Sequence, residues 1–402
     1  MKTILKQAMG LAEQLTDIRR DLHRQPELSF KEYRTTEYIT RILLQAGIEI
    51  VPWGGETGVV GLLKGGQPGP VVALRADIDG LPVTEENQCP HQSQQPGVMH
   101  ACGHDAHTAC LLGAALILAG RRASLTGTVK FIFQPAEEIN AGAQQMLDRG
   151  VLAQPAVDVI FGLHNTPTLA AGQIGCKDGP LMAAVDTTFL TIRGTGGHGA
   201  IPHSTRDPIT AAAAVIQGLQ TIVSRQVDPQ AAAVISFGTI HGGQAHNVIP
   251  DKVELTGTVR TFDAALRRQL PDKMQGLISG IAQALGTQAE FVYRQDLPAV
   301  FNPPGLAAWC RSRLEQVVGA DGLVVPVPSM GGEDFALFQE QVPGVFLWLG
   351  VGNPAQGIVH QWHHPCFDID EAALPYGAAA LAQLAWDYLT GNGPAAVAGD
   401  KP

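Results

Sequence analysis

The sequence predicts an α/β fold with a mixed sheet, in which a smaller ferredoxin-like α+β domain is inserted into a larger domain. Three observations predict this fold. The chain has 402 residues, more than one typical domain of roughly 100–200 residues. Helical and strand-like segments alternate in the first third, and they do so again after the proline-rich segment "LPAVFNPPG" at 297–305. Between these two parts, residues 184–296 follow a different and self-contained order.

The larger domain, residues 1–183 and 297–402, begins with a helix predicted over about residues 3–22. A second helix runs through "SFKEYRTTEYITRILLQAG", with Ser29 as its N-cap and Gly47 as its end. Several of the strand-like runs that follow are nearly all apolar, which is typical of strands covered on both faces. These runs are "GVVGLLKG", "VVALRADID", "TVKFIFQ" and "VDVIFGLHN", with the helix "TACLLGAALILAGRRA" between the second and the third. A helix, the strand "VPGVFLWLGVG" and a final helix from Glu371 complete the domain.

The inserted domain starts with the alternating strand "VDTTFLTIRG" and the helix "DPITAAAAVIQGLQTIVSR", which has Asp207 at its N-cap and Pro208 in its first turn. It continues with the strands "AAVISFGTIHGG" and "KVELTGTVRTF", the helix "AALRRQLPDKMQGLISGIAQALG" and the strand "AEFVYRQ". Strand-helix-strand-strand-helix-strand is the split βαβ order of a ferredoxin-like domain.

Composition excludes several classes of protein. The net charge is −10 and the chain has no basic stripe, so we expect no nucleic-acid partner. No run of about 18 apolar residues is present, so we expect no membrane span. The first residues lack the pattern of a signal peptide, and the six cysteines lack the spacing of a disulfide framework. These features predict a cytoplasmic protein.

Side chains that bind metals gather where four segments leave a predicted strand or enter a helix. "FIFQPAEE" and "VIFGLHN" leave strands, "HACGHDAH" opens a helix, and "HQWHHPCFDID" follows the last strand. Ligands collect beyond the carboxyl ends of strands in open α/β sheets, and mixed S, N and O donors suit transition metals. The predicted metal ligands are Cys102, His104, Glu138, His164 and His363.

Each of these motifs also has a purely structural interpretation. A cysteine that enters a helix is usually a small core residue, and adjacent glutamates at a helix start usually serve the helix dipole. A single histidine after a strand is usually a hydrogen-bonded core residue. Four separate segments that all carry ligand-type residues at ligand-prone positions nevertheless favour a metal site. Because a chain of this length folds without metal, we expect such a site to be functional.

The ordered motifs resemble the metal-dependent amidohydrolase and aminoacylase family. This family includes hippurate hydrolase, N-acyl-L-amino acid amidohydrolase and the IAA-amino acid hydrolases, and it is related to carboxypeptidase G-like metallopeptidases. The resemblance implies a catalytic di-metal hydrolase domain, an inserted lid or dimerisation domain, and a homodimer or higher homo-oligomer. It covers about residues 15–385 and rests on "HACGHDAHTA", "FQPAEE", "GLHN", "GGHGAIPHSTRDP", "HNVIPDKVELTGTVRTF", "GGEDFA" and "HHPCFDIDE".

The resemblance implies two divalent metal ions, manganese or zinc, with nickel or cobalt as alternatives. Cys102 would bridge them as a thiolate, with the other four predicted ligands completing the shells. The family's histidine-small residue-proline pattern falls on His363, His364 and Pro365, and His363 is the preferred ligand. Asp77 in "RADID" is predicted to orient a ligand rather than to bind metal, because Arg75 stands where distant relatives carry a histidine.

The remaining roles also follow from the resemblance. Glu137 would be the general base, His198 would stabilise the oxyanion, and Asn247 and Arg260 would bind the substrate carboxylate. Bound metal lowers the pKa of water from ~15.7 to about 7, which makes hydroxide available at neutral pH. The expected reaction is hydrolysis of the amide bond of an N-acyl amino acid, aromatic or aliphatic, to a carboxylic acid and an amino acid.

Three alternatives remain open from the sequence. The first is an exopeptidase or dipeptidase of the same family. The second is a cysteine hydrolase that pairs Cys102 with His104 or His107. The third is a metal-binding protein without catalytic activity, which the adjacent Glu137 and Glu138 disfavour because a purely structural site needs no additional base.

Overall fold

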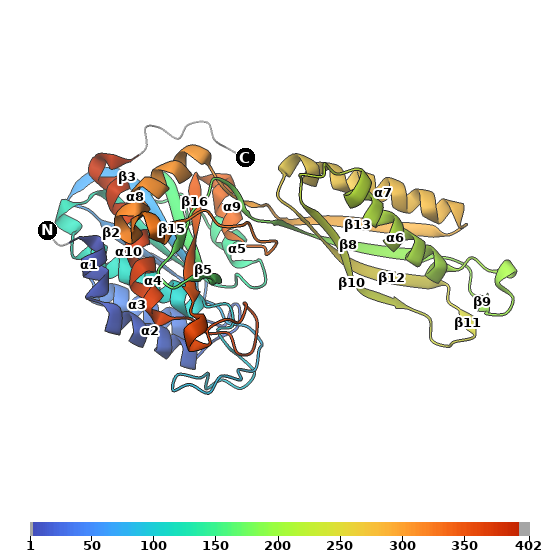
Figure 1. Cartoon of the computed structure of the whole chain (residues 1–402), viewed down its shortest axis with the longest axis horizontal. Coiled ribbons are helices and arrows are strands. Elements are labelled where there is room, and N and C mark those ends of the chain that lie inside the picture. The colour runs from blue at the N-terminus through green and yellow to red at the C-terminus, as the bar shows by residue number, and fades with distance from the viewer. Residues whose placement is uncertain (1–2, 394–402) are drawn as a thin grey trace. The chain divides into compact units, whose positions relative to one another are not determined.

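The computed structural model describes residues 3–393, which divide into two compact units (Figure 1). The first unit contains the residues up to Leu181, Phe301–Val327 and the residues from Asp334 on. The second unit contains Met182–Val300 and Pro328–Glu333, and the predicted insertion at 184–296 falls within it.

The first unit is built around an eight-stranded sheet. In their order across the sheet, its strands are β1 (Glu49–Ile50), β2 (Val59–Lys64), β4 (Thr126–Gln134), β3 (Gln67–Asp77), β5 (Val159–Ala170), β16 (Gly344–Gly352), β6 (Ile174–Gly175) and β15 (Leu323–Val324). The neighbours β4, β3, β5 and β16 run parallel, whereas β2 is antiparallel to β4 and β6 to β16. The sheet is therefore mixed, and the predicted α/β fold class is confirmed.

Helices cover the sheet of the first unit. They are α1 (Ile4–Met9), α2 (Ala12–Arg24), α3 (Tyr33–Gln45), α4 (His104–Ala119), α5 (Gly142–Asp148), α8 (Pro304–Gly322), α9 (Phe335–Gln341) and α10 (Leu374–Asp387). α4 packs against β3, α2 and α10, and nearly all of its residues are buried. Beyond its first residues, which include His104, Asp105 and His107, its sequence is apolar on every side, as expected for a buried helix. Among residues 3–393, no helix has both the length and the apolarity needed to cross a membrane.

Two predictions about the first helices are wrong. The single helix expected over 3–22 is two helices, because α1 ends at Met9 and Gly10 caps it with its backbone N–H. Ser29 is not an N-cap, since α3 begins only at Tyr33. The Ser29 hydroxyl instead donates a hydrogen bond to Asp79 Oδ2 (2.7 Å), a partner 50 residues away that local sequence patterns do not show.

The second unit contains a four-stranded antiparallel sheet and two long helices (Figure 1). The strand order is β10 (Ala233–Gly242), β12 (Lys252–Thr261), β8 (Ala184–Arg193) and β13 (Gln288–Leu297), and the helices are α6 (Pro208–Arg225) and α7 (Ala264–Ala284). Along the chain this gives the strand-helix-strand-strand-helix-strand order that the sequence predicts. Asp207 caps α6 as predicted, because its side chain accepts hydrogen bonds from Ile209 N and Thr210 N.

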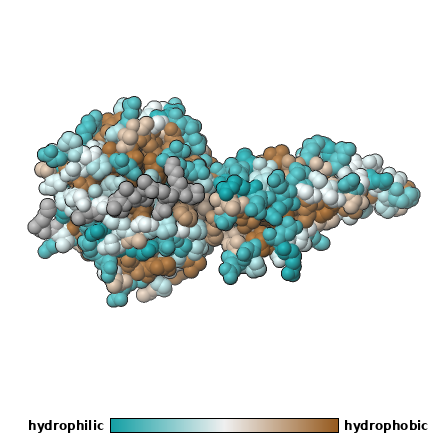
Figure 2. All heavy atoms as spheres, turned by 90° about the horizontal axis from the view of Figure 1, so that it is seen from above, coloured by the Kyte–Doolittle hydropathy of each residue, from teal (hydrophilic) through white to brown (hydrophobic). Residues whose placement is uncertain are grey.

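The second unit has its own apolar core, formed between α6, α7 and one face of the sheet. Phe189 and Val292 are register partners on β8 and β13, and both are exposed. In Figure 2, hydrophilic and hydrophobic side chains are mixed on the visible surface of this unit. Two further strands, β7 (Gly179–Met182) and β14 (Val300–Asn302), pair where the chain passes between the units.

Candidate metal centre

The candidate metal centre lies at the carboxyl ends of the parallel strands in the first unit. β3 ends at Asp77 and β4 at Gln134, and these residues are register partners, so the segments that leave both strands start side by side. The segment after β4 carries Glu137 and Glu138. α4, which packs against β3, begins with His104. The predicted ligands therefore gather at the edge where open α/β sheets bind ligands.

Three overlapping groups of side chains carry the donor atoms of the site, and within each group these atoms lie within 4.8 Å of one another. All five predicted ligands and the predicted base come together in this way, from four segments that are far apart in the sequence. We call these six residues the donor cluster. The three groups are Cys102, His104 and His164; Cys102, Glu138 and His363; and His104, Glu137 and Glu138.

Two buried polar atoms of the donor cluster face each other without a hydrogen bond. His104 Nε2 and Glu138 Oε1 are 3.7 Å apart, and in the described part of the chain neither has a hydrogen-bond partner. His363 Nε2 lies 3.5 Å from the other oxygen of Glu138. Buried polar groups are normally paired, so such atoms need an explanation. A metal ion between imidazole and carboxylate would provide a partner for both atoms.

Negative charge accumulates around the donor cluster. Burial raises the pKa of the Cys102 thiol well above its usual value, and the carboxylates of Glu138 and Glu137 raise it further. Burial opposes the protonation of His104, but the charge of Asp77, the hydrogen bond to Asp79 and the charge of Glu138 outweigh it and raise the pKa of His104 to about 10. A surplus of carboxylate beside a thiol and imidazoles fits divalent transition-metal ions, whose charge it would balance.

Gly103 allows the sharp turn between Cys102 and His104. Its φ is +84°, and a Cβ at this position would lie 2.3 Å from Asn165 Nδ2. Glycine is the residue that tolerates both the left-handed backbone and this close approach. Asn165 Nδ2 in turn donates a hydrogen bond to Cys102 O (2.6 Å). Sequence reasoning missed Asn165, and its signal was its position directly after His164 in "GLHN".

His164 lies within β5 and not at the end of a strand, which corrects the prediction. β5 continues because β16 pairs with it up to Ala170, whereas β3 pairs with it only up to Gly162. His164 Nδ1–H donates to Asn165 O (2.8 Å), which leaves the lone pair of Nε2 for Cys102 Sγ, 3.4 Å away. Burial lowers the pKa of His164 well below its usual value, so the ring is neutral, the form that binds metals.

Two aspartates orient the histidines of α4. Asp79 Oδ1 lies 3.1 Å from His104 Nδ1, so this carboxylate directs the other ring nitrogen of His104 toward the donor cluster. Asp77 Oδ1 lies 2.5 Å from His107 Nδ1 but 3.8 Å from His104 Nδ1. Asp77 is therefore placed to orient His107, and the direct partner of His104 is Asp79. The signal for Asp79 was the two-residue spacing of the aspartates in "RADID".

His363, and not the neighbouring His364, lies with Cys102 and Glu138. Its φ is +66°, which is uncommon for a residue with a side chain, and its backbone N–H donates to Ala101 O (2.8 Å). This backbone conformation turns His363 toward the donor cluster, while the ring of His364 stacks on another residue of the same segment. The geometry thus favours the ligand that we preferred from the sequence.

Sequence reasoning also missed a buried charged network at the start of α4. Arg19 donates hydrogen bonds to Asp105 Oδ2 and Asp368 Oδ1, each at 2.8 Å, and His23 Nδ1 lies 2.7 Å from the same oxygen of Asp105. Although burial opposes it, the charges of Arg19 and His23 hold the pKa of Asp105 well below its usual range. Asp105 follows His104 directly, so this network fixes the backbone of a predicted ligand. Its signal was the spacing of Arg19 and His23, one turn apart on the buried face of α2.

The predicted substrate-binding residues belong to the second unit. β9 (Gly197–His198) pairs with β11 (Val248–Ile249), and Gly199 N donates to Asn247 O (2.8 Å), so His198 and Asn247 lie on adjoining turns. Both residues are exposed. Arg260 lies in β12, partly buried, and its guanidinium donates hydrogen bonds to Thr258 Oγ1 and to Val259 O.

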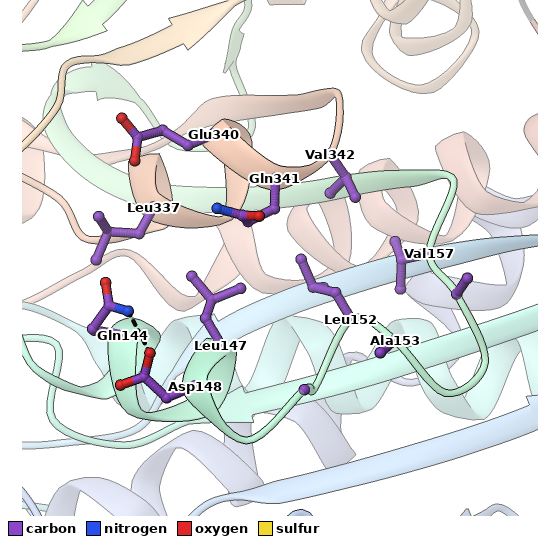
Figure 3. Close-up of a pocket in the computed structure, with 12 residues that line it drawn as sticks. Gln144, Leu147, Asp148, Leu152, Ala153, Val157, Leu337, Glu340, Gln341 and Val342 are labelled. Carbon is purple, nitrogen blue, oxygen red and sulfur yellow. Dashed lines mark hydrogen bonds between the residues drawn. The ribbon is translucent and has the colours of Figure 1, made fainter.

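A hollow of about 530 Å³ in the first unit lies between α5, the loop that follows it and α9 (Figure 3). Leu147, Leu152 and Leu337 line it together with Asp148, which accepts a hydrogen bond from Gln144. Its lining, all within the described part of the chain, includes no residue of the donor cluster. We therefore do not assign the reaction to this hollow.

Proteins of known sequence and structure resemble this chain over nearly its whole length. The model of a family described as peptidase family M20/M25/M40 matches residues 73–387. An N-acetylcysteine deacetylase of Bacillus subtilis is 47% identical over 376 residues, which cover 92% of this chain and 96% of that protein. The IAA-amino acid hydrolase ILR1-like 4 of Arabidopsis thaliana is 39% identical over 379 residues, covering 93% of this chain and 86% of that protein.

A solved structure has the same fold as this chain over nearly its whole length. The Bacillus subtilis protein YXEP, described as a dinuclear metal-binding peptidase of the M20 family, superposes with a TM-score of 0.83 at 44% sequence identity. The match covers 95% of this chain and 99% of that chain.

Proposed function

This chain belongs to peptidase family M20/M25/M40, which confirms the predicted family resemblance, and from that premise we propose that it is an N-acyl-amino acid amidohydrolase. It would hydrolyse the amide bond of an N-acylated amino acid to a carboxylic acid and a free amino acid. The observation that carries the proposal is the donor cluster, in which two orphaned buried ligand atoms lie beside Glu137. The names of the two relatives support the substrate class, since one acts on N-acetylcysteine and the other on IAA-amino acids.

The five predicted ligands would hold two divalent metal ions, for which manganese and zinc are the first candidates and nickel and cobalt are alternatives. The relative described as a dinuclear metal-binding peptidase supports this number. When bound, such ions supply Lewis-acid catalysis and water of lowered pKa. The ligand residues are Cys102, His104, Glu138, His164 and His363.

Glu137 would hold and move the proton of the reaction. It is buried, and its carboxylate lies in one group with the side chains of His104 and Glu138. One of its carboxylate oxygens would accept a proton from the attacking water and pass it to the nitrogen of the leaving amine. The adjacent Glu138, which faces two histidines, would serve as a ligand instead. Two neighbouring glutamates thus divide binding and proton transfer.

We assign three residues of the second unit to the substrate. His198 would stabilise the oxyanion of the tetrahedral intermediate, and Asn247 and Arg260 would bind the carboxylate of the amino acid. The guanidinium of Arg260 supports this role because it donates hydrogen bonds to a hydroxyl and a carbonyl, and it is a planar donor suited to a carboxylate. The enzyme would work as a homodimer or higher homo-oligomer, and the exposed apolar pair Phe189 and Val292 supports association through the second unit.

We place the enzyme in the cytoplasm. All six cysteines are free thiols, including the half-buried Cys89 and Cys366. Free thiols persist in a reducing compartment, and the proposed role of Cys102 as a ligand also requires a reduced side chain.

A substrate panel tests the proposal. The panel compares benzoyl-glycine, indoleacetyl-amino acids, N-acetyl-amino acids and simple dipeptides, with enzyme that is intact, stripped by a chelator, or reloaded with Mn²⁺ or Zn²⁺. We expect N-acyl amino acids to be hydrolysed fastest, with turnover lost on stripping and restored on reloading. Faster hydrolysis of dipeptides would show an exopeptidase, and turnover that resists chelation but is lost to thiol reagents would show a cysteine hydrolase. A fully metallated protein that hydrolyses none of these amides would overturn the enzymatic assignment.

A further inference from the structure

A second group of metal-binding side chains lies in the segment that follows β16. The donor atoms of His360, His364 and Cys366 lie within 4.8 Å of one another. His364 is exposed, and His360 and Cys366 are half-buried. This group shares no residue with the donor cluster, which takes only His363 from this segment.

The two rings of this group are already arranged side by side. The rings of His360 and His364 stack with their centroids 4.1 Å apart and their planes at 12°. Cys366 N donates a hydrogen bond to His364 Nδ1 (3.0 Å), so the lone pair of Nδ1 points toward Cys366 and the ring proton is on Nε2. A metal ion would replace one backbone hydrogen bond at an exposed ring, which is a small cost.

Backbone hydrogen bonds hold this segment on the first unit. Glu86 N donates to Pro365 O (3.0 Å), and His363 N donates to Ala101 O (2.8 Å). Phe367, which is fully buried, closes the turn by donating from its backbone N–H to His364 O (2.9 Å). An anchored segment loses little conformational entropy when an ion binds, because most of its ordering has occurred on folding.

We propose that His360, His364 and Cys366 form a separate surface site for one soft transition-metal ion of the Zn²⁺ class. Two imidazoles and a thiolate are ligands that zinc, cobalt, nickel and copper share, and they are poor ligands for Ca²⁺ or Mg²⁺. Three protein ligands at an exposed position leave the fourth place of a tetrahedral shell to water. Binding displaces the thiol proton of Cys366 into solvent.

Metal stoichiometry of the full-length protein tests this site. Wild type, Cys366→Ser, His364→Ala and the matched control Cys89→Ser are equilibrated with the same free Zn²⁺ concentration, and bound zinc is measured by mass spectrometry. We expect Cys366→Ser and His364→Ala each to bind one ion fewer per chain than wild type, and Cys89→Ser to bind as many as wild type. Equal zinc content in all four proteins would overturn the proposal.

Thiol labelling locates the ion independently of any variant. Cys89 and Cys366 are both half-buried free thiols, so an alkylating reagent can be followed at both by peptide mass spectrometry. We expect Zn²⁺ to slow the labelling of Cys366 and a chelator to restore it, with Cys89 unaffected by either. If Cys366 is labelled at the same rate with and without Zn²⁺, the proposed site is wrong. This holds whatever zinc content the variants show, because labelling of wild type does not depend on how a substitution affects the fold.

Discussion

Glu137 and Glu138 are neighbours in the chain but have different surroundings. The two oxygens of Glu138 lie 3.7 Å from His104 Nε2 and 3.5 Å from His363 Nε2, and burial raises the pKa of this carboxyl to about 7. A carboxylate so placed between two imidazoles is suited to bind a cation. Glu137 precedes it directly, and its carboxylate shares one group of donor atoms with His104 and Glu138, where we propose that it acts as the base.

The variant Glu137→Gln separates these roles. We expect kcat to fall by about 10²–10⁴-fold, because an amide cannot accept the proton, while the metal content stays that of wild type. Metal analysis and steady-state kinetics on the same preparation measure both quantities. Glu138→Gln is the matched control and should lose metal together with activity. A Glu137→Gln enzyme that retains its turnover would contradict the assigned base.

Glu32 gives a prediction for the pH dependence of stability. Burial raises its pKa from 4.5 to about 7, while Oε1 accepts hydrogen bonds from Phe30 N and Ala136 N. The folded state therefore binds this proton more tightly than the unfolded state does. Its stabilising contribution is complete below about pH 4.5 and is lost as the pH rises through 7.

Glu32→Gln keeps the acceptor oxygen but cannot titrate. We expect the unfolding free energy of the variant, relative to wild type, to increase by roughly 3 kcal/mol between pH 4.5 and 7 and then to remain constant. Urea unfolding of both proteins at several pH values measures this difference. A difference that does not change with pH would show that the carboxyl has the same pKa in the folded and unfolded states, and would contradict the raised pKa of Glu32.

Short motifs mark residues whose own chemistry is that of a metal ligand, and they do not mark residues whose partners are remote in the sequence. Cys102, His104 and Glu138 are ligand types at strand or helix ends, and short motifs show them. Arg19 was not predictable, because its partner Asp105 is 86 residues away and becomes a neighbour only when α2 packs on α4.

At the scale of elements, the apolar runs predicted the central strands well, because strands buried on both faces have an unbroken apolar sequence. The limits of β5 were missed, since pairing with β16, and not local sequence, extends it to Ala170. The break after α1 was missed because a single glycine, Gly10, does not by itself end a helical pattern. Strands of two residues, such as β6 and β15, carry no local signal at all.

The turn at the start of α4 sets the positions of two predicted ligands, Cys102 and His104. Gly103 and Gly97 both have left-handed backbones, with φ of +84° and +76°. A Cβ at Gly103 would collide with Asn165, whereas one at Gly97 would meet no atom within 4 Å. Gly97→Ala should therefore cost only the backbone strain, about 1 kcal/mol, and leave the metal affinity unchanged. Gly103→Ala should cost roughly 2 kcal/mol or more and weaken metal binding, because it moves Cys102 and His104.

Urea unfolding and a competitive metal titration of the two variants measure these effects. Equal metal affinities in Gly97→Ala and Gly103→Ala would mean that the turn does not set the positions of the ligands.

At the scale of the whole molecule, metal donors and proposed substrate binders belong to different units. All six residues of the donor cluster lie in the first unit, and His198, Asn247 and Arg260 lie in the second. Each unit has a core of its own. Substitution of a proposed substrate-binding residue in the second unit should therefore lower the catalytic rate without changing the metal content.

Arg260→Ala tests this division. We expect kcat/KM to fall roughly ten- to a hundredfold, because a charged hydrogen-bond donor to the substrate is lost, with the metal content unchanged. The matched control is Arg193→Ala on the neighbouring strand β8, where the exposed pair of Arg193 with Glu290 (3.0 Å) has no proposed role and should be neutral. The same kcat/KM in both variants would show that Arg260 does not bind the substrate.

We propose that remote segments of the first unit converge to hold a pair of divalent ions. Anomalous X-ray scattering from crystals of the protein grown with Mn²⁺ or Zn²⁺ would locate these ions. We predict two anomalous peaks next to Cys102 Sγ, and each of the other four ligands should contact at least one of them. Crystals of Cys102→Ala should show neither peak. Metal-loaded, active crystals with no anomalous peak next to Cys102 would contradict the account.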